Sequence, residues 1–107
     1  VYSYVPGKDT EARKLFSLDD DRLKGNRKRI TGIDSDVNFY YFLTPANVLR
    51  VNRNTLSLQF FPLDSAVHKQ PEGIAMMDNG SVYLVDDRKD GAGGLSHYKT
   101  LESISNF

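Results

Sequence analysis

Three acidic residues in the second half of the chain have the chemistry to bind a hard cation. Glu72 stands just before a predicted strand, and Asp86 and Asp87 close the next one. Calcium takes about six to eight oxygen ligands, many of them carboxylates. Because adjacent strand residues point to opposite faces, only one of Asp86 and Asp87 can share a face with Glu72. The alternative roles are structural: Glu72 can cap its strand, and the aspartates can cap a loop or pair with Arg88 or Lys89.

A basic cluster in the first third of the chain is a candidate anion site. Five cations lie within eight residues, directly after the acidic run 19–21. Such a cluster can bind phosphate or another anion, and its densest part is Arg27, Lys28 and Arg29. No aromatic residue lies among them for base stacking, and the neighbouring aspartates offset the attraction. The alternative is a solvated connection between two structural units. The five cations are Arg22, Lys24, Arg27, Lys28 and Arg29.

Other groups with catalytic chemistry are sparse. His68 and His97 lie far apart in the sequence and in no metal-ligand spacing. The chain has no cysteine, so thiolate nucleophiles and thiolate metal sites are excluded. No Gly-x-Ser-x-Gly motif is present. A lone histidine is more often a surface or hydrogen-bonded residue, and this is the expectation for both.

Strands joined by tight turns are the elements that would position these residues. Apolar runs at 74–77 and 82–85 flank Asn79-Gly80, and Asn-Gly supplies the positive φ angles of a tight hairpin turn. An earlier hairpin begins at Gly32, passes through a polar turn at 34–38, and continues into an aromatic strand at 39–43. The pattern predicts two antiparallel hairpins.

The hairpin pattern recurs at a fixed distance. Gly73 lies 41 residues after Gly32, and a third strand follows each hairpin. A period of about 40–50 residues with four strands per unit is typical of a β-propeller blade. We therefore expect an all-β chain that holds two to three blades: the end of one at 1–18, a full blade at 30–63 and most of a further blade at 70–107. The other predicted strands lie at 1–5, 14–18, 48–51, 56–61, 95–98 and 101–107.

The length of the chain leaves three arrangements open. A propeller closes with about four to eight blades, whereas this chain has 107 residues. The chain is then part of a longer protein, or it assembles with copies of itself or with another chain that supplies the remaining blades. The third arrangement is a small sandwich or open sheet. The start on a strand at Val1 favours the first.

The segment 70–98 resembles a known kind of repeat. Gln70-Pro71-Glu72-Gly73-Ile74-Ala75, followed by Asp-Asn-Gly and Val-Tyr-Leu-Val-Asp-Asp, is similar to repeats of the SdiA-regulated propellers and of phytase-like esterase domains, and to NHL-like repeats. The resemblance implies a propeller in which the Glu of Pro-Glu-Gly faces the central channel and helps to bind a metal, commonly calcium. The residue in that position would be Glu72. The earlier repeat departs from the pattern, because Thr31 stands in the equivalent place.

Composition limits the classes of partner that the chain can have. Fourteen basic and fourteen acidic side chains give no net charge, which argues against nucleic acid as the main partner. No apolar run is long enough to span a bilayer, and we expect a secreted or periplasmic location. The first hypothesis is a binding or scaffold module with a calcium site near the channel. The second is a calcium-dependent phytase-like phosphoesterase, and the third is a structural protein that pairs with itself or another chain through open blade edges.

Overall fold

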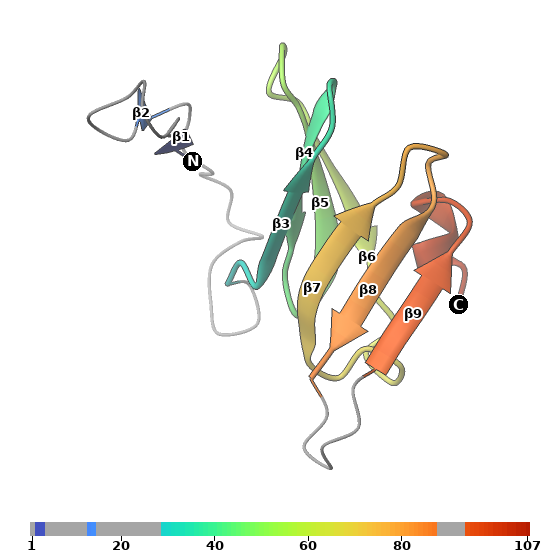
Figure 1. Cartoon of the computed structure of the whole chain (residues 1–107). Coiled ribbons are helices and arrows are strands. Elements are labelled where there is room, and N and C mark those ends of the chain that lie inside the picture. The colour runs from blue at the N-terminus through green and yellow to red at the C-terminus, as the bar shows by residue number, and fades with distance from the viewer. Residues whose placement is uncertain (1, 4–12, 15–28, 88–93) are drawn as a thin grey trace.

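The chain folds into antiparallel sheets, which confirms the all-β prediction. The computed structural model describes residues 2–3, 13–14, 29–87 and 94–107. Four consecutive strands form one sheet in the order β3-β4-β5-β6, as Figure 1 shows. They are β3 (Gly32–Ser35), β4 (Phe39–Leu43), β5 (Asn47–Asn52) and β6 (Leu58–Pro62). The four strands predicted between residues 30 and 63 are therefore present.

A second sheet has three strands in the order β7-β8-β9. The chain then enters a short 3-10 helix, η2 (Glu102–Ser105). Near the N-terminus, β1 (Tyr2–Ser3) pairs antiparallel with β2 (Arg13–Lys14). In the described part of the chain, no helix is long and apolar enough to cross a membrane. The three strands are β7 (Pro71–Met76), β8 (Val82–Asp86) and β9 (Gly94–Tyr98).

The predicted strand at 101–107 is wrong, because this segment contains η2. Side-chain hydroxyls organise the turn locally: Ser103 N–H donates to Thr100 Oγ1, and Ser103 Oγ donates to the Thr100 carbonyl. Such local bonds compete with pairing in a sheet. Leu101 and Ile104 are three residues apart, which places both on one side of the turn, and both are buried.

The Asn79-Gly80 turn follows the expected chemistry in part, because the positive φ lies on Gly80 and not on Asn79. Gly80 has φ +85°, and the Asn79 side chain accepts hydrogen bonds from the N–H and the hydroxyl of Ser81. In the earlier hairpin, one oxygen of Asp36 accepts the N–H groups of Asn38 and Phe39. These side chains fix the hairpin turns and so the registers of the strands that follow.

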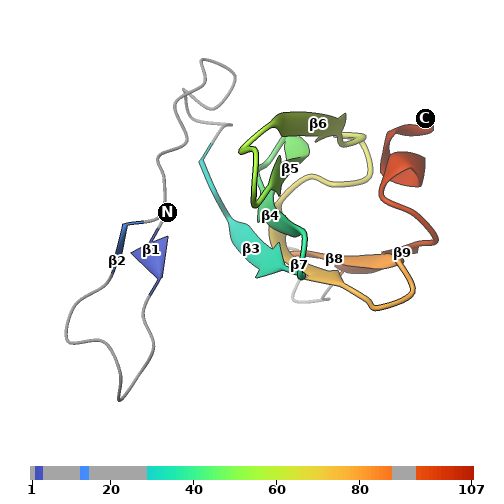
Figure 2. The same ribbon diagram turned by 90° about the horizontal axis from the view of Figure 1, so that it is seen from above.

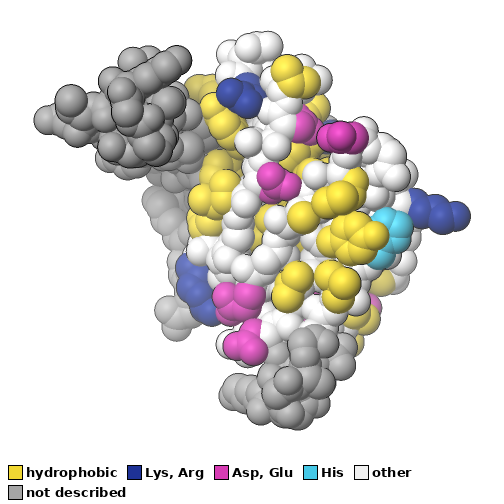
Figure 3. Space-filling model, viewed as in Figure 1, with side chains coloured by type: hydrophobic (Ala, Val, Ile, Leu, Met, Phe, Trp, Pro, Cys, Tyr) yellow, Lys and Arg dark blue, Asp and Glu magenta, His cyan; other side chains and the backbone are white. Residues whose placement is uncertain are grey.

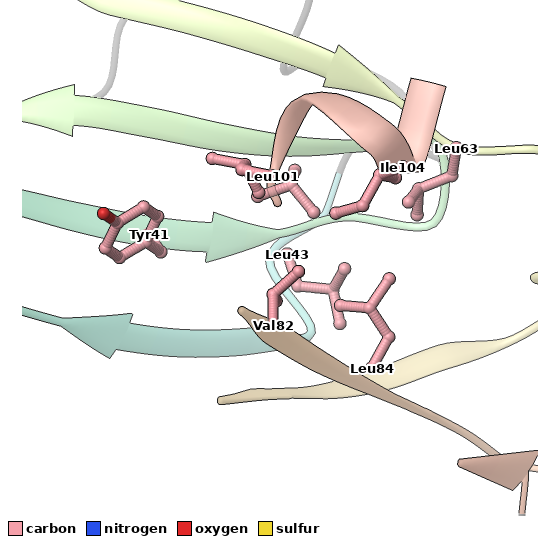
Figure 4. Close-up of a cluster of buried hydrophobic side chains, with 8 residues drawn as sticks. Tyr41, Leu43, Leu63, Val82, Leu84, Leu101 and Ile104 are labelled. Atoms are coloured by element: carbon pink, nitrogen blue, oxygen red, sulfur yellow. The ribbon is translucent and has the colours of Figure 1, made fainter. Parts of the chain in front are cut away.

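The two sheets share one hydrophobic core. They lie together at β3 and β7 and diverge toward β6 and β9, with η2 at the open side (Figure 2). Side chains from both sheets and from η2 fill the space between them, and Leu43 points toward Val82 and Leu84 (Figure 4). A second cluster, centred on Phe42, Leu49 and Val51, covers the other face of the four-stranded sheet. The shared core contains Tyr41, Leu43, Val48, Leu63, Val82, Leu84, Leu101 and Ile104.

The first strands of the two sheets are in direct contact. A Cβ added at Gly32 would lie 3.4 Å from the Glu72 carbonyl oxygen and from Gly73 Cα, which is about van der Waals distance and shows that the two backbones are neighbours here. Asp34 on β3 accepts a hydrogen bond from the N–H of Met76 on β7, with N and Oδ2 2.6 Å apart. This side chain therefore joins the two hairpins where no ladder of backbone hydrogen bonds does.

Replacing Asp34 by alanine is expected to lower the free energy of unfolding by about 1–2 kcal/mol, because the Met76 N–H loses its acceptor in a half-buried place. Denaturation in urea measures this loss. Asp78→Ala is the matched control, since Asp78 is exposed in the turn after β7, and it should stay within about 0.5 kcal/mol of the parent chain. Equal losses in the two variants would contradict the bridging role of Asp34.

Candidate functional site

The three predicted calcium ligands occupy different environments. Pairing between β7 and β8 shifts register between Pro71 and Gly73, so Glu72 is the extra residue of a bulge, and it is exposed. Asp86 is buried at the end of β8, and Asp87 follows it in an exposed position. Within the described ranges, no three His, Cys, Asp or Glu residues gather in a way that could hold a metal ion. Calcium binding by these residues stays a prediction.

Asp86 instead belongs to a buried hydrogen-bonded group of three side chains. His68 Nδ1 lies 2.7 Å from Asp86 Oδ1, and His68 Nε2 lies 2.5 Å from the Tyr98 hydroxyl. The second oxygen of Asp86 accepts the N–H of Gln70. Each ring nitrogen of His68 thus has one side-chain partner, and which atom donates in each bond depends on the tautomer of the ring. We call Asp86, His68 and Tyr98 the histidine triad.

The histidine triad connects three elements that are separate in the sequence. His68 comes from the segment between the two sheets, whereas Asp86 ends β8 and Tyr98 ends β9. The N–H of His68 also bonds to the Asp64 carbonyl, so the connecting segment folds back on itself before it inserts the ring. Because β8 and β9 are antiparallel, Asp86 and Tyr98 lie at opposite ends of this strand pair, and the triad therefore fixes the connecting segment across the three-stranded sheet.

The chemistry of the triad is that of a structural clamp. A hydroxyl, an imidazole and a carboxylate in line resemble a nucleophile with its base and orienting acid. However, burial raises the pKa of Tyr98, and the negative charges of Asp86 and Asp64 raise it further, so the phenol keeps its proton at neutral pH. The His68 side chain is fully buried, which leaves a substrate no access to the ring.

The sequence did not identify this clamp. The expectation that His68 is hydrogen-bonded is confirmed, but neither of its side-chain partners was foreseen. They lie 18 and 30 residues further along the chain. The available signal was a histidine close before a strand, with an acid at the end of the next strand and a tyrosine at the end of the third.

The basic cluster lies mostly outside the described residues. Arg27 and Lys28 lie outside the described residues, whereas Arg29 is described and is exposed close to the start of β3. Anion binding by these three residues stays a prediction. The other histidine, His97, is exposed on β9, and its ring lies 4.5 Å from that of Tyr83, measured between centroids.

A second ionisable group lies at the tip of the first hairpin. The Tyr41 hydroxyl donates to Asp36 Oδ2 over 2.7 Å. Burial alone would raise the pKa of Asp36, but the hydrogen bonds from Tyr41 and from the N–H groups of Asn38 and Phe39, together with the charge of Arg50, lower it overall. Burial and the carboxylate of Asp36 raise the pKa of Tyr41. The pair is thus stable as carboxylate and phenol.

This pair should make part of the stability depend on acid pH. The pKa of Asp36 is lower in the folded chain than its ordinary value of 3.8, so its contribution is present above that value and is lost as the pH falls through the folded-state pKa. In Tyr41→Phe, the fall in unfolding free energy from pH 6 to about pH 2 should be smaller. Urea titrations across this range measure it, and identical pH profiles would contradict the role of the hydroxyl.

One face of the three-stranded sheet is apolar and exposed. Val85 is 44% exposed and Leu95 is 68% exposed, and they pair across β8 and β9. Figure 3 shows hydrophobic side chains gathered beside a histidine over this region. We call the face that carries Ala75, Tyr83, Val85, Leu95 and His97 the open face. No family model matches the chain, and no curated protein or solved structure was found to be similar to it.

Proposed function

We propose that the chain is a scaffold or binding module of the β-propeller kind. In such a module each sheet packs one face on the preceding sheet and presents its opposite face to the next sheet. One observation carries the proposal: the two sheets pack against each other through opposite faces of the repeated unit. Their first strands, β3 and β7, lie side by side, as the innermost strands of neighbouring blades would.

The registers show which faces correspond. Ile33 pairs with Phe42 in the first hairpin, and Ile74 pairs with Leu84 in the second, so these pairs occupy equivalent positions. Phe42 faces the second cluster, away from β7–β9, whereas Leu84 lies in the shared core. The Ile74–Leu84 face of β7–β9, which packs on the first sheet, is therefore equivalent to the Ile33–Phe42 face of β3–β6, which points away from β7–β9.

The opposite faces of the two sheets are equivalent as well. Leu43 pairs with Gly32, and Val85 pairs with Gly73, in equivalent positions. Leu43 is fully buried in the shared core, whereas Val85 is exposed. The open face therefore repeats the position of a face that packs against the next sheet. Its partner in our proposal is a further blade with an aliphatic and aromatic face, from the same or another chain.

A tandem chain tests the stacking. A copy of residues 64–107 is joined after Phe107, so that its Ile74–Leu84 side can dock on the open face of the parent unit. Because repeat proteins gain stability from each interface between neighbours, the midpoint of thermal unfolding should rise by several degrees, on the order of 5 °C. The same tandem with Val85→Asp in the first unit is the control and should lose the rise. No rise in the parent tandem would contradict the proposal.

A further inference from the structure

The outer edge of β9 is an unpaired strand edge. In the first sheet, β6 pairs with β5 and completes four strands, but within the described residues no strand takes that position beside β9. The chain that follows β9 forms η2 instead. This helix lies against β6, where Ser105 Oγ donates to the Pro62 carbonyl over 2.9 Å.

The pairing pattern shows which backbone groups lie on this edge. Met77 N–H donates to the Ser81 carbonyl, which extends the ladder between β7 and β8 by one pair. Because such bonds alternate along a strand, Tyr83 and Val85 point their backbone groups toward β7, and Leu84 points its groups toward β9.

Leu84 pairs with Ser96, so Ser96 exchanges its hydrogen bonds with β8. The residues on either side of it, Leu95 and His97, therefore direct their N–H and C=O groups away from β8. Four backbone groups, two donors and two acceptors, are arranged symmetrically about Ser96 on the free edge.

The sequence of β9 offers no protection against pairing. Exposed strand edges in natural proteins commonly carry proline, lysine or another charge, which discourages strand addition. β9 reads Gly-Leu-Ser-His-Tyr and has none of these. The outer strand of the other sheet, β6, ends in Pro62, which lacks an N–H donor.

We propose that β9 pairs antiparallel with β9 of a second copy of this chain, about a two-fold axis that passes between the two Ser96 residues. Leu95 of one copy then exchanges both hydrogen bonds with His97 of the other, and the symmetry repeats the exchange, which satisfies all four groups. The contact is self-complementary, as a two-fold interface requires. No charged residue opposes another across it. This pairing uses the edge of the sheet and is independent of stacking on the open face.

A single introduced cysteine tests the axis directly. In this arrangement the two Ser96 residues face each other as a non-hydrogen-bonded pair with Cα atoms about 4.5 Å apart, within the range of a disulfide. Since the chain has no cysteine, Ser96→Cys should form disulfide-linked dimers under mild oxidation. His97→Cys is the matched control: the two positions lie diagonally across the axis, more than about 7 Å apart, and should not link. Linking in neither variant, or equally in both, would overturn the proposal.

Mass in solution provides the second measurement. The parent chain should show a concentration-dependent dimer by analytical ultracentrifugation. His97→Pro removes an N–H that points to the free edge and should give a folded monomer, whereas His97→Ala keeps the backbone donor and should stay dimeric. A monomeric parent chain would overturn the proposal. So would a dimer that survives His97→Pro but is lost in Val85→Asp, since that result assigns the contact to the open face.

Discussion

His68→Ala is expected to lower the free energy of unfolding by about 3 kcal/mol, because it leaves a buried carboxylate and a hydroxyl without their partner and opens a cavity. Asp86 would keep only the Gln70 N–H as a donor, and Tyr98 would lose its hydrogen-bond partner. The connecting segment between the sheets would also lose the ring that fixes it to β8 and β9. Urea denaturation monitored by circular dichroism measures the change.

His97→Ala is the matched control for this experiment. It removes the same side chain from an exposed place on β9, where the ring only lies beside Tyr83. The expected loss is about 0.5 kcal/mol. If the two histidine variants lose the same stability, the histidine triad does not clamp the sheet.

The strands could be predicted because their signals are local. The aromatic run at 39–43, the alternation after residue 56 and the Asn79-Gly80 turn each specify conformation within a few residues. The segment at 101–107 was wrongly predicted as a strand, because Leu101 and Ile104 are apolar and every other predicted element of the chain is a strand. Their spacing and the hydroxyls of Thr100 and Ser103 favour a turn instead.

The candidate site could not be predicted in the same way, because its contacts join distant residues. Asp86 is acidic and ends a strand, which suits either a metal ligand or a hydrogen-bonded partner. Only folding brings His68 to it, and this pairing gives the carboxylate a structural role. Glu72 is the opposite case. It is exposed on a bulge, as a channel ligand would be, but among the described residues it belongs to no cluster of carboxylates or imidazoles that could hold a metal ion.

The shared core makes the two sheets one cooperative unit, and Leu43 is the residue that tests this. Leu43 is fully buried between the sheets, in a cluster that includes Val82 and Leu84 of β8. Leu43→Ala should therefore lower the free energy of unfolding by about 3–4 kcal/mol, through lost burial and the cavity that remains. Since the cluster belongs to both sheets, the transition should stay single when followed by circular dichroism and by tyrosine fluorescence.

Leu56→Ala supplies the comparison, because Leu56 is 44% exposed in the turn before β6. Its loss should be about 0.5 kcal/mol. Two separate transitions in Leu43→Ala would show that each sheet folds by itself and that the interface between them contributes little. That result would also weaken the proposed stacking, since the open face of β7–β9 is expected to bind a further sheet through the same kind of contact that Leu43 makes here. A single, strongly shifted transition would show that stacking of one sheet on the next supplies much of the stability of this fold.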